Sequence, residues 1–210
     1  MIFMNMGERR RLFLHVFRKA ELKYGKNVKR LSGEGWGKPW QTMIATMMSA
    51  QSRDEVTVPV AENLFRMYPT LDKLAKASRS EVLNAIRSIN YNRTKAKNVI
   101  GAAKMILEDF EGKIPENVEE LTKLPGVGRK TANLFLSEVH GEDTITVDTH
   151  VHRISNVMGI VKTKTPEHTE RELMKIAPKK YWSRINRLFV LWGKDCPGRD
   201  RKKLLSRLDG

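Results

Sequence analysis

Apolar residues recur at helical spacing along most of this chain, and no two long stretches alternate as paired β-strands would. Residues 8–24 carry apolar side chains three and four positions apart, and residues 40–51 are apolar nearly all round, as in a centrally buried helix. Caps, prolines and glycines delimit further predicted helices at residues 53–68, 78–89, 94–110, 117–124, 129–140, 148–159, from 165 onward and at 181–192. Ser78 and Glu81 match a capping box, and Asn117 and Asp148 are expected N-caps. Residues 144–147 are extended but too short to build a sheet, so the sequence predicts an all-α fold.

Glycines also predict where helices stop. Gly141, Gly159 and Gly193 each follow a helical stretch and are expected at helix ends, where the left-handed conformation favours glycine. A basic tail without a further helix is expected after Gly193.

Charge and cysteine content narrow the function. The 210 residues contain 39 lysines and arginines against 24 aspartates and glutamates, which gives a net charge of +15. An excess of this size predicts attraction to a polyanion, with nucleic acid as the leading candidate, although surplus lysine can also serve solubility alone. The one cysteine, Cys196, excludes a disulfide within the chain and suits a reducing cytoplasm.

The sequence gives no sign of a membrane or secreted protein. No stretch approaches the ~20 apolar residues that span a bilayer. The short apolar start is followed, rather than preceded, by the basic residues Arg9, Arg10 and Arg11, unlike a secretory signal. We therefore expect a cytoplasmic protein that does not contact a membrane.

The most informative stretch is a glycine turn at residues 124–132, which reads LPGVGRKTA. Pro125 ends one helix, and Gly126 and Gly128 permit left-handed backbone angles and the close approach of another molecule. The next helix begins with free amide N–H groups and the positive end of its dipole, which together form a cradle for a phosphate. A side chain at Gly128 would hold a phosphate away. An ordinary tight turn between two packed helices is the alternative.

Three further segments accompany this turn. Residues 48–54 read MSAQSRD, residues 89–98 read INYNRTKAKN, and residues 147–150 read VDTH. Asp148 follows Lys130 by 148 − 130 = 18 residues. Together with the turn, these segments resemble the helix-hairpin-helix motif and its flanking sequences in the endonuclease III superfamily of DNA glycosylases. The resemblance runs from about residue 40 to residue 159 and continues weakly to residue 193, and the four ordered motifs make it specific.

The resemblance implies two helical lobes with DNA bound between them. One lobe is a six-helix domain at residues 31–142, which contains the hairpin, and the other is discontinuous, formed by residues 1–30 and 143–210. The implied activity is that of a base-excision-repair DNA glycosylase with β-lyase activity at abasic sites, acting as a monomer on damaged double-stranded DNA. Oxidised pyrimidines are the expected substrates. The alternatives are thymine or uracil mismatched with guanine, 8-oxoguanine, and a structural DNA-binding protein without enzymatic activity.

Two residues match the family's catalytic positions. Lys130 corresponds to the nucleophile, whose uncharged amine would displace the base, form a Schiff base with the opened sugar and allow β-elimination of the 3′ phosphate. Arg129 beside it and the helix N-terminus both favour the uncharged amine. Asp148 matches the catalytic aspartate, whose anion would stabilise positive charge on the sugar. From the residues alone, the alternatives are that Lys130 contacts a phosphate without reacting and that Asp148 is a helix cap without a catalytic role. Capping and catalysis by Asp148 are compatible.

The resemblance assigns other residues to DNA binding. Gln51 corresponds to the residue that fills the gap left by a flipped nucleotide, and its amide can pair with the widowed base. Tyr91 aligns with a second wedge, where an aromatic ring can stack in the opened duplex, although Asn90 replaces a glycine that is common in this segment. The remaining candidates are Pro125, Gly126, Val127, Gly128, Arg129, Thr131 and His150. His150 would orient Asp148 or contact a phosphate, and a packed histidine is the alternative.

Many members of this family carry a [4Fe–4S] cluster held by four cysteines after the last helix. Cys196 aligns with the first of them, but the other three are absent and the tail is basic. One thiolate cannot hold such a cluster, so no iron–sulfur cofactor is expected, and no zinc or other metal constellation is visible. The C-terminal lobe is expected to be held by helix packing through Trp182, Leu188, Phe189 and Trp192. The family's hairpin carbonyls often bind a monovalent cation with the DNA phosphate, and the resemblance allows such an ion here.

Overall fold

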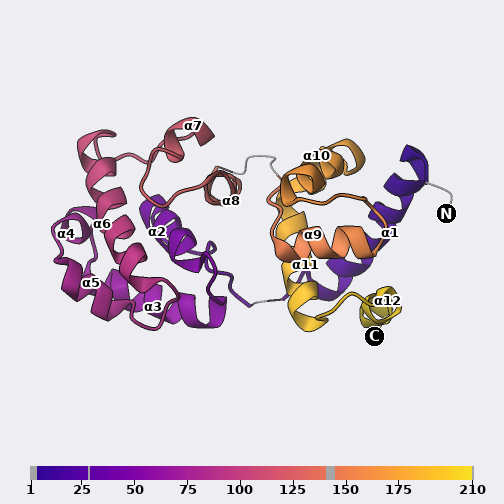
Figure 1. Cartoon of the computed structure of the whole chain (residues 1–210), viewed down its shortest axis with the longest axis horizontal. Coiled ribbons are helices and arrows are strands. Elements are labelled where there is room, and N and C mark those ends of the chain that lie inside the picture. Colours follow the sequence, from indigo (N-terminus) through magenta and orange to yellow (C-terminus); the bar gives the residue numbers. More distant parts are fainter. Residues whose placement is uncertain (1–3, 28, 141–144, 210) are drawn as a thin grey trace. The chain divides into compact units, whose positions relative to one another are not determined.

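The computed structural model describes residues 4–27, 29–140 and 145–209 of the chain. Every regular element in these ranges is helical, which confirms the predicted all-α class (Figure 1). The elements are α1 (Met6–Tyr24), α2 (Pro39–Ser49), α3 (Asp54–Met67), α4 (Leu71–Ala75), α5 (Arg79–Ala85), α6 (Asn92–Glu108), α7 (Val118–Leu121), α8 (Arg129–Val139), α9 (Thr149–Val157), α10 (Pro166–Ile176), the 3₁₀ turn η1 (Lys179–Tyr181), α11 (Trp182–Asp195) and α12 (Arg201–Asp209).

Contacts within the chain divide it into two compact units. The first unit is Arg30–Glu142 and contains α2 to α8. The second unit combines Met1–Lys29 with Asp143–Gly210, so that α1 packs against α10, α11 and α12, although the whole first unit separates them in sequence. The glycine turn and residues 48–54 and 89–98 belong to the first unit, and Asp148 belongs to the second.

Helix α2 forms the centre of the first unit, and it packs against α3, α6 and α8. Met43, Met47 and Met48 are at most 4% exposed, so these flexible side chains fill the core, in agreement with the central burial predicted for residues 40–51. The buried hydroxyl of Thr46 donates to the Thr42 carbonyl at 2.7 Å. Helix α2 can therefore be buried on nearly all sides without leaving this hydroxyl unpaired.

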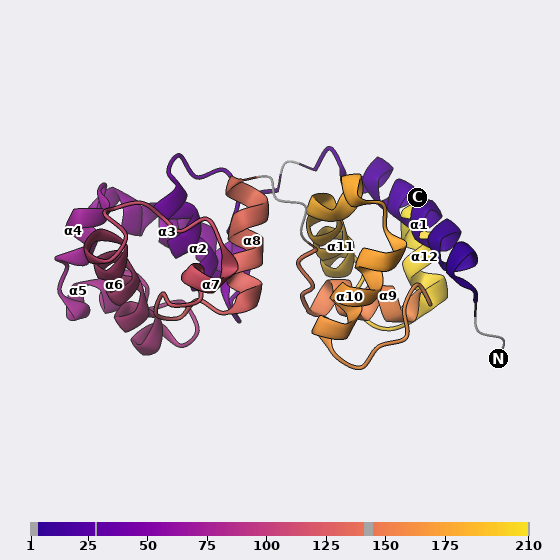
Figure 2. The same ribbon diagram turned by 90° about the horizontal axis from the view of Figure 1, so that it is seen from above.

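The second unit is built on an aromatic core between α1 and α11. Phe13 and Phe17 of α1 and Phe189 and Trp192 of α11 are completely buried, and the last two rings meet edge to face at 5.7 Å. Helix α12 lies beside α1 (Figure 2). Burial of large aromatic side chains is the main stabilising contribution in a unit of this size. The predicted packing residues Leu188, Phe189 and Trp192 are buried, and Trp182 is half-buried.

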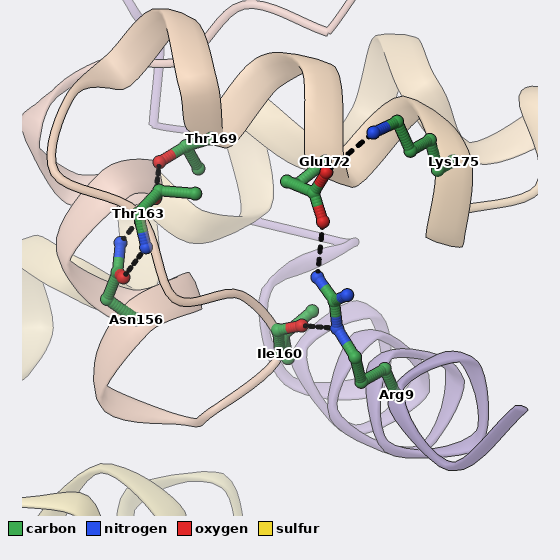
Figure 3. A network of polar contacts seen from close by, with 7 residues as sticks. All are labelled: Arg9, Asn156, Ile160, Thr163, Thr169, Glu172 and Lys175. Atoms are coloured by element: carbon green, nitrogen blue, oxygen red, sulfur yellow. Dashed lines mark hydrogen bonds and ion pairs between the residues drawn. The ribbon is translucent and has the colours of Figure 1, made fainter. Parts of the chain in front are cut away.

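A polar network ties the segment between α9 and α10 to α1 (Figure 3). The Arg9 guanidinium donates to the Ile160 carbonyl at 2.9 Å and pairs with Glu172 at 2.9 Å. The Asn156 side chain accepts from the Thr163 amide at 2.8 Å. These contacts fix both ends of the connection because they satisfy backbone groups that no helix pairs.

Two expectations about the C-terminal region are wrong. Helix α11 runs through Gly193 to Asp195, and the tail forms α12. A Cβ built on Gly193 would lie 2.9 Å from Cβ of His150, so this glycine permits the close approach of α9 rather than ending α11. The Arg207 guanidinium pairs with Asp195 at 2.6 Å and thereby anchors α12 to the end of α11.

Other helix ends agree with the sequence to different degrees. Gly159 has φ +79° directly after α9, as predicted for a helix end. The capping box that starts at Ser78 is present, but α5 ends at Ala85 rather than near residue 89. Helix α4 was not predicted. Gly141, the expected end of α8, lies outside the described residues.

Candidate functional site

The glycine turn between α7 and α8 is packed onto α6. Gly126 has φ +81°, and a Cβ there would lie 2.9 Å from Cβ of Asn98, so both backbone angle and packing require glycine. A Cβ on Gly101 of α6 would lie 3.3 Å from Cγ of Pro125, which shows how closely the turn approaches this helix. Val127 is buried, and its amide donates to the Leu124 carbonyl at 3.0 Å. The turn is therefore held by its own residues and by α6.

Gly128 differs from Gly126, because nothing in the described structure requires a glycine there. Its φ of −98° is accessible to any residue, and a Cβ would meet no atom within 4 Å. Gly128 nevertheless precedes α8, whose first amides have no partner within the helix; the bond from the Ala132 amide to the Gly128 carbonyl opens the helical series. The space that a side chain would fill lies open beside these amides. This arrangement suits the close approach of an anion to the backbone.

Lys130 is the second residue of α8 and is exposed, as is Arg129 beside it. Thr131 is half-buried. Within the described residues, Lys130 forms no ion pair or side-chain hydrogen bond. Its amine is therefore available to an external molecule at the helix end where the positive dipole lies.

Asp148 caps α9, as the sequence predicts. Its Oδ1 atom accepts from the His150 amide at 2.9 Å and from the Val151 amide at 2.8 Å. The carboxylate is half-buried, and Oδ2 takes neither of these bonds. Asp148 is thus fixed through one oxygen while the other is not used by the cap.

His150 follows Asp148 by two residues, and its ring lies against α11. A Cβ on Gly193 would come closest to Nδ1 of this ring. In the cap, the backbone amide of His150 donates to Asp148 Oδ1. The ring lies close to the backbone of α11 at Gly193.

The structure brings Gln51 and Tyr91 together. Both have left-handed backbones, with φ +55° and +57°, and both are exposed, Tyr91 to 66%. The side-chain amide of Asn90 donates to the Gln51 carbonyl at 2.7 Å, and the Asn90 backbone amide donates to Ser52 Oγ at 3.2 Å. The two wedge candidates therefore lie on loops that are bonded to each other.

Sequence reasoning gave no role to Lys95, which binds the same loop. Its side chain is only 8% exposed, and Nζ donates to the Met48 carbonyl at 2.7 Å, to the Ala50 carbonyl at 2.6 Å and to Ser52 Oγ at 3.1 Å. Burial lowers the pKa of Lys95 from 10.5 to about 8. The sequence contains a sign of this burial, because the helical spacing places Lys95 on the same apolar face of α6 as Val99.

No metal centre is evident in the part of the chain that the structure describes. No group of three or more His, Cys, Asp or Glu side chains there could hold a metal ion. Cys196 is buried at the end of α11 and is the one cysteine of the 210 residues, so it could supply one of the four thiolates that hold a [4Fe–4S] cluster. None of the described helices combines the length and the apolar character needed to cross a membrane.

Comparisons with known proteins agree on one family. A model described as "HhH-GPD superfamily base excision DNA repair protein" matches residues 44–179. The chain is 42% identical over 156 residues to endonuclease III of Thermotoga maritima, covering 74% of this chain and 73% of the relative. It is 38% identical over 157 residues to endonuclease III of Bacillus subtilis, covering 74% and 72%.

Solved structures of endonuclease III bound to DNA are also similar. A non-covalent endonuclease III–DNA complex matches with a TM-score of 0.82 and 29% identity over 96% of this chain and 99% of that one. A trapped endonuclease III–DNA covalent intermediate matches with a TM-score of 0.81 and 31% identity over 89% and 86%. The chain therefore belongs to the HhH-GPD superfamily of base excision DNA repair proteins, as an endonuclease III-like DNA glycosylase and abasic-site lyase.

Proposed function

We propose that this enzyme removes oxidised pyrimidines, such as thymine glycol, from double-stranded DNA and cleaves the resulting abasic site by β-elimination. The observation that carries the proposal is the exposed lysine at the second position of α8, directly after a glycine turn with an open backbone. The similarity to endonuclease III of other organisms supports the substrate class.

Lys130 is the proposed nucleophile. Its uncharged Nζ attacks C1′ of the damaged nucleotide, a C–N bond forms and the glycosidic bond to the base breaks. The sugar ring then opens to a Schiff base. Loss of a proton from C2′ expels the 3′ phosphate, which cleaves the strand. A glycosylase without such an amine would stop after base removal.

Asp148 is the proposed electrostatic partner on the same nucleotide. Its carboxylate would stabilise the positive charge that develops on the sugar as the base leaves, and would accept the lysine proton. The cap leaves Oδ2 for this role, because Oδ1 takes both amide bonds. Capping and catalysis would then use different oxygens of one side chain.

The proposed DNA contacts follow from the exposed backbone of the turn. The amides around Gly128 would hold a phosphate, with Pro125, Gly126 and Val127 shaping the turn and Arg129 and Thr131 beside it. A monovalent cation on the turn's carbonyl oxygens, together with that phosphate, is part of the proposal. Gln51 and Tyr91 would fill the gap left by the flipped nucleotide. We also propose that the protein works as a cytoplasmic monomer without an iron–sulfur cluster.

Borohydride trapping on duplex DNA with a single abasic site tests the mechanism. Borohydride reduces a Schiff base to a stable amine, so the wild type should give a covalent adduct and Lys130→Gln should give none. Lys113→Gln, which removes an exposed lysine after α6, should trap like the wild type. Equal trapping by Lys130→Gln would overturn the assignment of the nucleophile.

Excision on matched duplexes tests the substrate class. Duplexes containing thymine glycol, 8-oxoguanine, or thymine or uracil opposite guanine should be cleaved fastest at thymine glycol. Faster excision of a mismatched pyrimidine or of 8-oxoguanine would replace the proposed substrate by that alternative.

A further inference from the structure

Two exposed residues of the first unit adopt backbone angles that their side chains disfavour. The described chain has three non-glycine residues in the left-handed region, and two of them are Gln51 and Tyr91. Such a conformation is strained for a residue with a Cβ and persists only where surrounding contacts impose it. Neither side chain is buried, so packing of the side chains themselves cannot be the cause.

At Gln51, contacts from Asn90 hold the backbone. Its Nδ2 atom donates to the Gln51 carbonyl at 2.7 Å, and its backbone amide donates to Ser52 Oγ at 3.2 Å. Asn90 directly precedes Tyr91, the N-cap residue of α6. Asn90 therefore holds the backbone of Gln51 and is the sequence neighbour of Tyr91. A glycine at this position would have no side chain to make the bond to Gln51.

Lys95 of α6 also binds the loop that contains Gln51. Its Nζ atom donates to the Met48 carbonyl, the Ala50 carbonyl and Ser52 Oγ. These three bonds use all three donors of the ammonium group. The two carbonyls lie at the C-terminal end of α2, where helical partners are missing. Ser52 Oγ accepts from both Lys95 and Asn90, so it joins the two supports.

Burying a lysine here is unfavourable in itself. The side chain is 8% exposed, and burial lowers its pKa to about 8. An apolar side chain at this position on α6 would avoid that cost but could not bind three oxygens. The lysine is thus better explained by the loop geometry it imposes than by the stability of the core.

We propose that Asn90 and Lys95 are positioning residues that hold Gln51 and Tyr91 as one two-pronged element, preorganised to enter the duplex where a nucleotide has left the stack. This inference rests on the proposed function, because it needs Gln51 to fill that gap. Preorganisation favours binding since the ordering of both loops has occurred before DNA arrives. The element should therefore affect binding to an interrupted duplex and not binding to intact DNA.

A double-mutant cycle tests the role of Asn90. The probe is a duplex with one tetrahydrofuran abasic-site analogue opposite 2-aminopurine, whose fluorescence reports the stacking of the opposite base. The variants are Asn90→Ala, Gln51→Ala and the double variant, each also measured on the intact duplex. Asn92→Ala is the matched control, because Asn92 is the first residue of α6 and its side-chain amide donates to the Arg87 carbonyl at 2.7 Å rather than to Gln51.

We expect Asn90→Ala to weaken binding to the analogue by about 3- to 10-fold, the range for one lost hydrogen bond, and to change the 2-aminopurine signal. Binding to the intact duplex should stay constant. In the Gln51→Ala background, Asn90→Ala should cause little further loss, since Asn90 acts through Gln51. Asn92→Ala and Gln51→Ala should combine additively.

Two results would overturn the inference, and they are distinguishable. If Gln51→Ala weakens binding to the analogue but Asn90→Ala does not, or if the two losses simply multiply, then Asn90 does not position Gln51 although the proposed function stands. If Gln51→Ala itself binds the analogue as the wild type does, the proposed role of Gln51 fails, and the inference fails with it.

Lys95 is tested on the same probe. Lys95→Met should lower affinity for the analogue by about 10-fold or more, since three bonds are lost, while the intact duplex is bound as before. Lys104→Met, an exposed lysine further along α6, is the control. Lys95→Arg retains a charged donor and should recover part of the loss. Circular dichroism of each variant confirms folding. Analogue binding by a folded Lys95→Met that equals the wild type would overturn the role of Lys95.

Discussion

The His150 ring lies against the backbone of Gly193, so closely that a Cβ on Gly193 would be 2.9 Å from Cβ of His150. The same Cβ would be 2.9 Å from a guanidinium nitrogen of Arg153. This contact brings α9, which begins at the Asp148 cap, directly onto α11. The position of Asp148 in its unit therefore depends on a glycine far along the chain.

Gly193→Ala should destabilise the protein. The methyl group would overlap His150, and overpacking of this kind costs about 1–3 kcal/mol, of which the better helix propensity of alanine returns up to about 1 kcal/mol. A fall in the free energy of unfolding of about 1–2 kcal/mol in urea is expected. Gly7→Ala, also in a helix but with its nearest neighbour at 3.4 Å, should keep or raise stability, by up to about 1 kcal/mol. Equal stability of both variants would contradict this packing.

Substitutions of Asp148 should separate capping from catalysis. Asparagine caps helices as well as aspartate, so Asp148→Asn should keep the thermal midpoint, whereas Asp148→Ala should lose about 1 kcal/mol. Removal of the negative charge should nevertheless lower the single-turnover excision rate of Asp148→Asn by about 100-fold or more. A full rate in Asp148→Asn together with a loss in Asp148→Ala would leave Asp148 a cap only.

The buried Lys95 should make stability depend on alkaline pH. Its folded pKa of about 8 lies below the unfolded value of 10.5, so between these pH values the unfolded state binds more protons. Stability from this group is therefore reduced below pH 8 and rises as pH increases toward 10.5, by at most about 3 kcal/mol. Urea unfolding from pH 7 to pH 10 should show the wild type gaining on Lys95→Met. If the free energies of unfolding of wild type and Lys95→Met changed equally with pH, the prediction would be wrong. For the control Lys104→Met, the same pH dependence as the wild type is expected.

Asp195 should make stability depend on acidic pH. Hydrogen bonds from Arg207 and then Tyr24 lower its pKa from 3.8 to about 2. A depressed carboxyl pKa contributes stability that is present above about pH 4 and lost as pH falls toward 2. Because the pair is partly exposed, we expect about 1 kcal/mol or less. The stability difference between wild type and Asp195→Asn should shrink over this interval, and a constant difference would contradict the pairing.

Cys196 should not serve as a cluster ligand. Purified protein from iron-supplied cells should lack the broad visible absorption of an iron–sulfur cluster, because one thiolate cannot hold it. Cys196→Ala should retain borohydride trapping within about 3-fold, with a stability loss of about 1 kcal/mol from the small cavity. A visible band that disappears in Cys196→Ala would show that a cluster forms after all.

Local signals in the sequence were sufficient for the helices and for the turn. The Ser78 capping box, the Asn117 cap and the Asp148 cap all form as predicted, because each needs only the amides two or three residues further on. Gly126 and Gly159 adopt positive φ as expected for residues without a Cβ. The all-α class follows from the same short-range information.

Gly193 was misread because its reason is not local. A glycine after an apolar helical stretch predicts a helix end, and only the packing of His150 explains why α11 continues past it. The tail after Gly193 is rich in charge, yet it forms α12, because Leu204 and Leu208 are buried and Arg207 pairs with Asp195. Tertiary contacts overrode the local pattern in both places.

The sequence by itself determined the helical class and the glycine turn before α8, and its motifs singled out the candidates Lys130 and Asp148, since caps, turns and motif residues act over a few positions. Only the tertiary structure decided that Asn90 and Lys95 fasten Gln51 beside Tyr91. These bonds join residues about forty positions apart, between the end of α2 and the start of α6. No periodicity or propensity encodes such a pairing, because it exists only once the core has brought the two helices together.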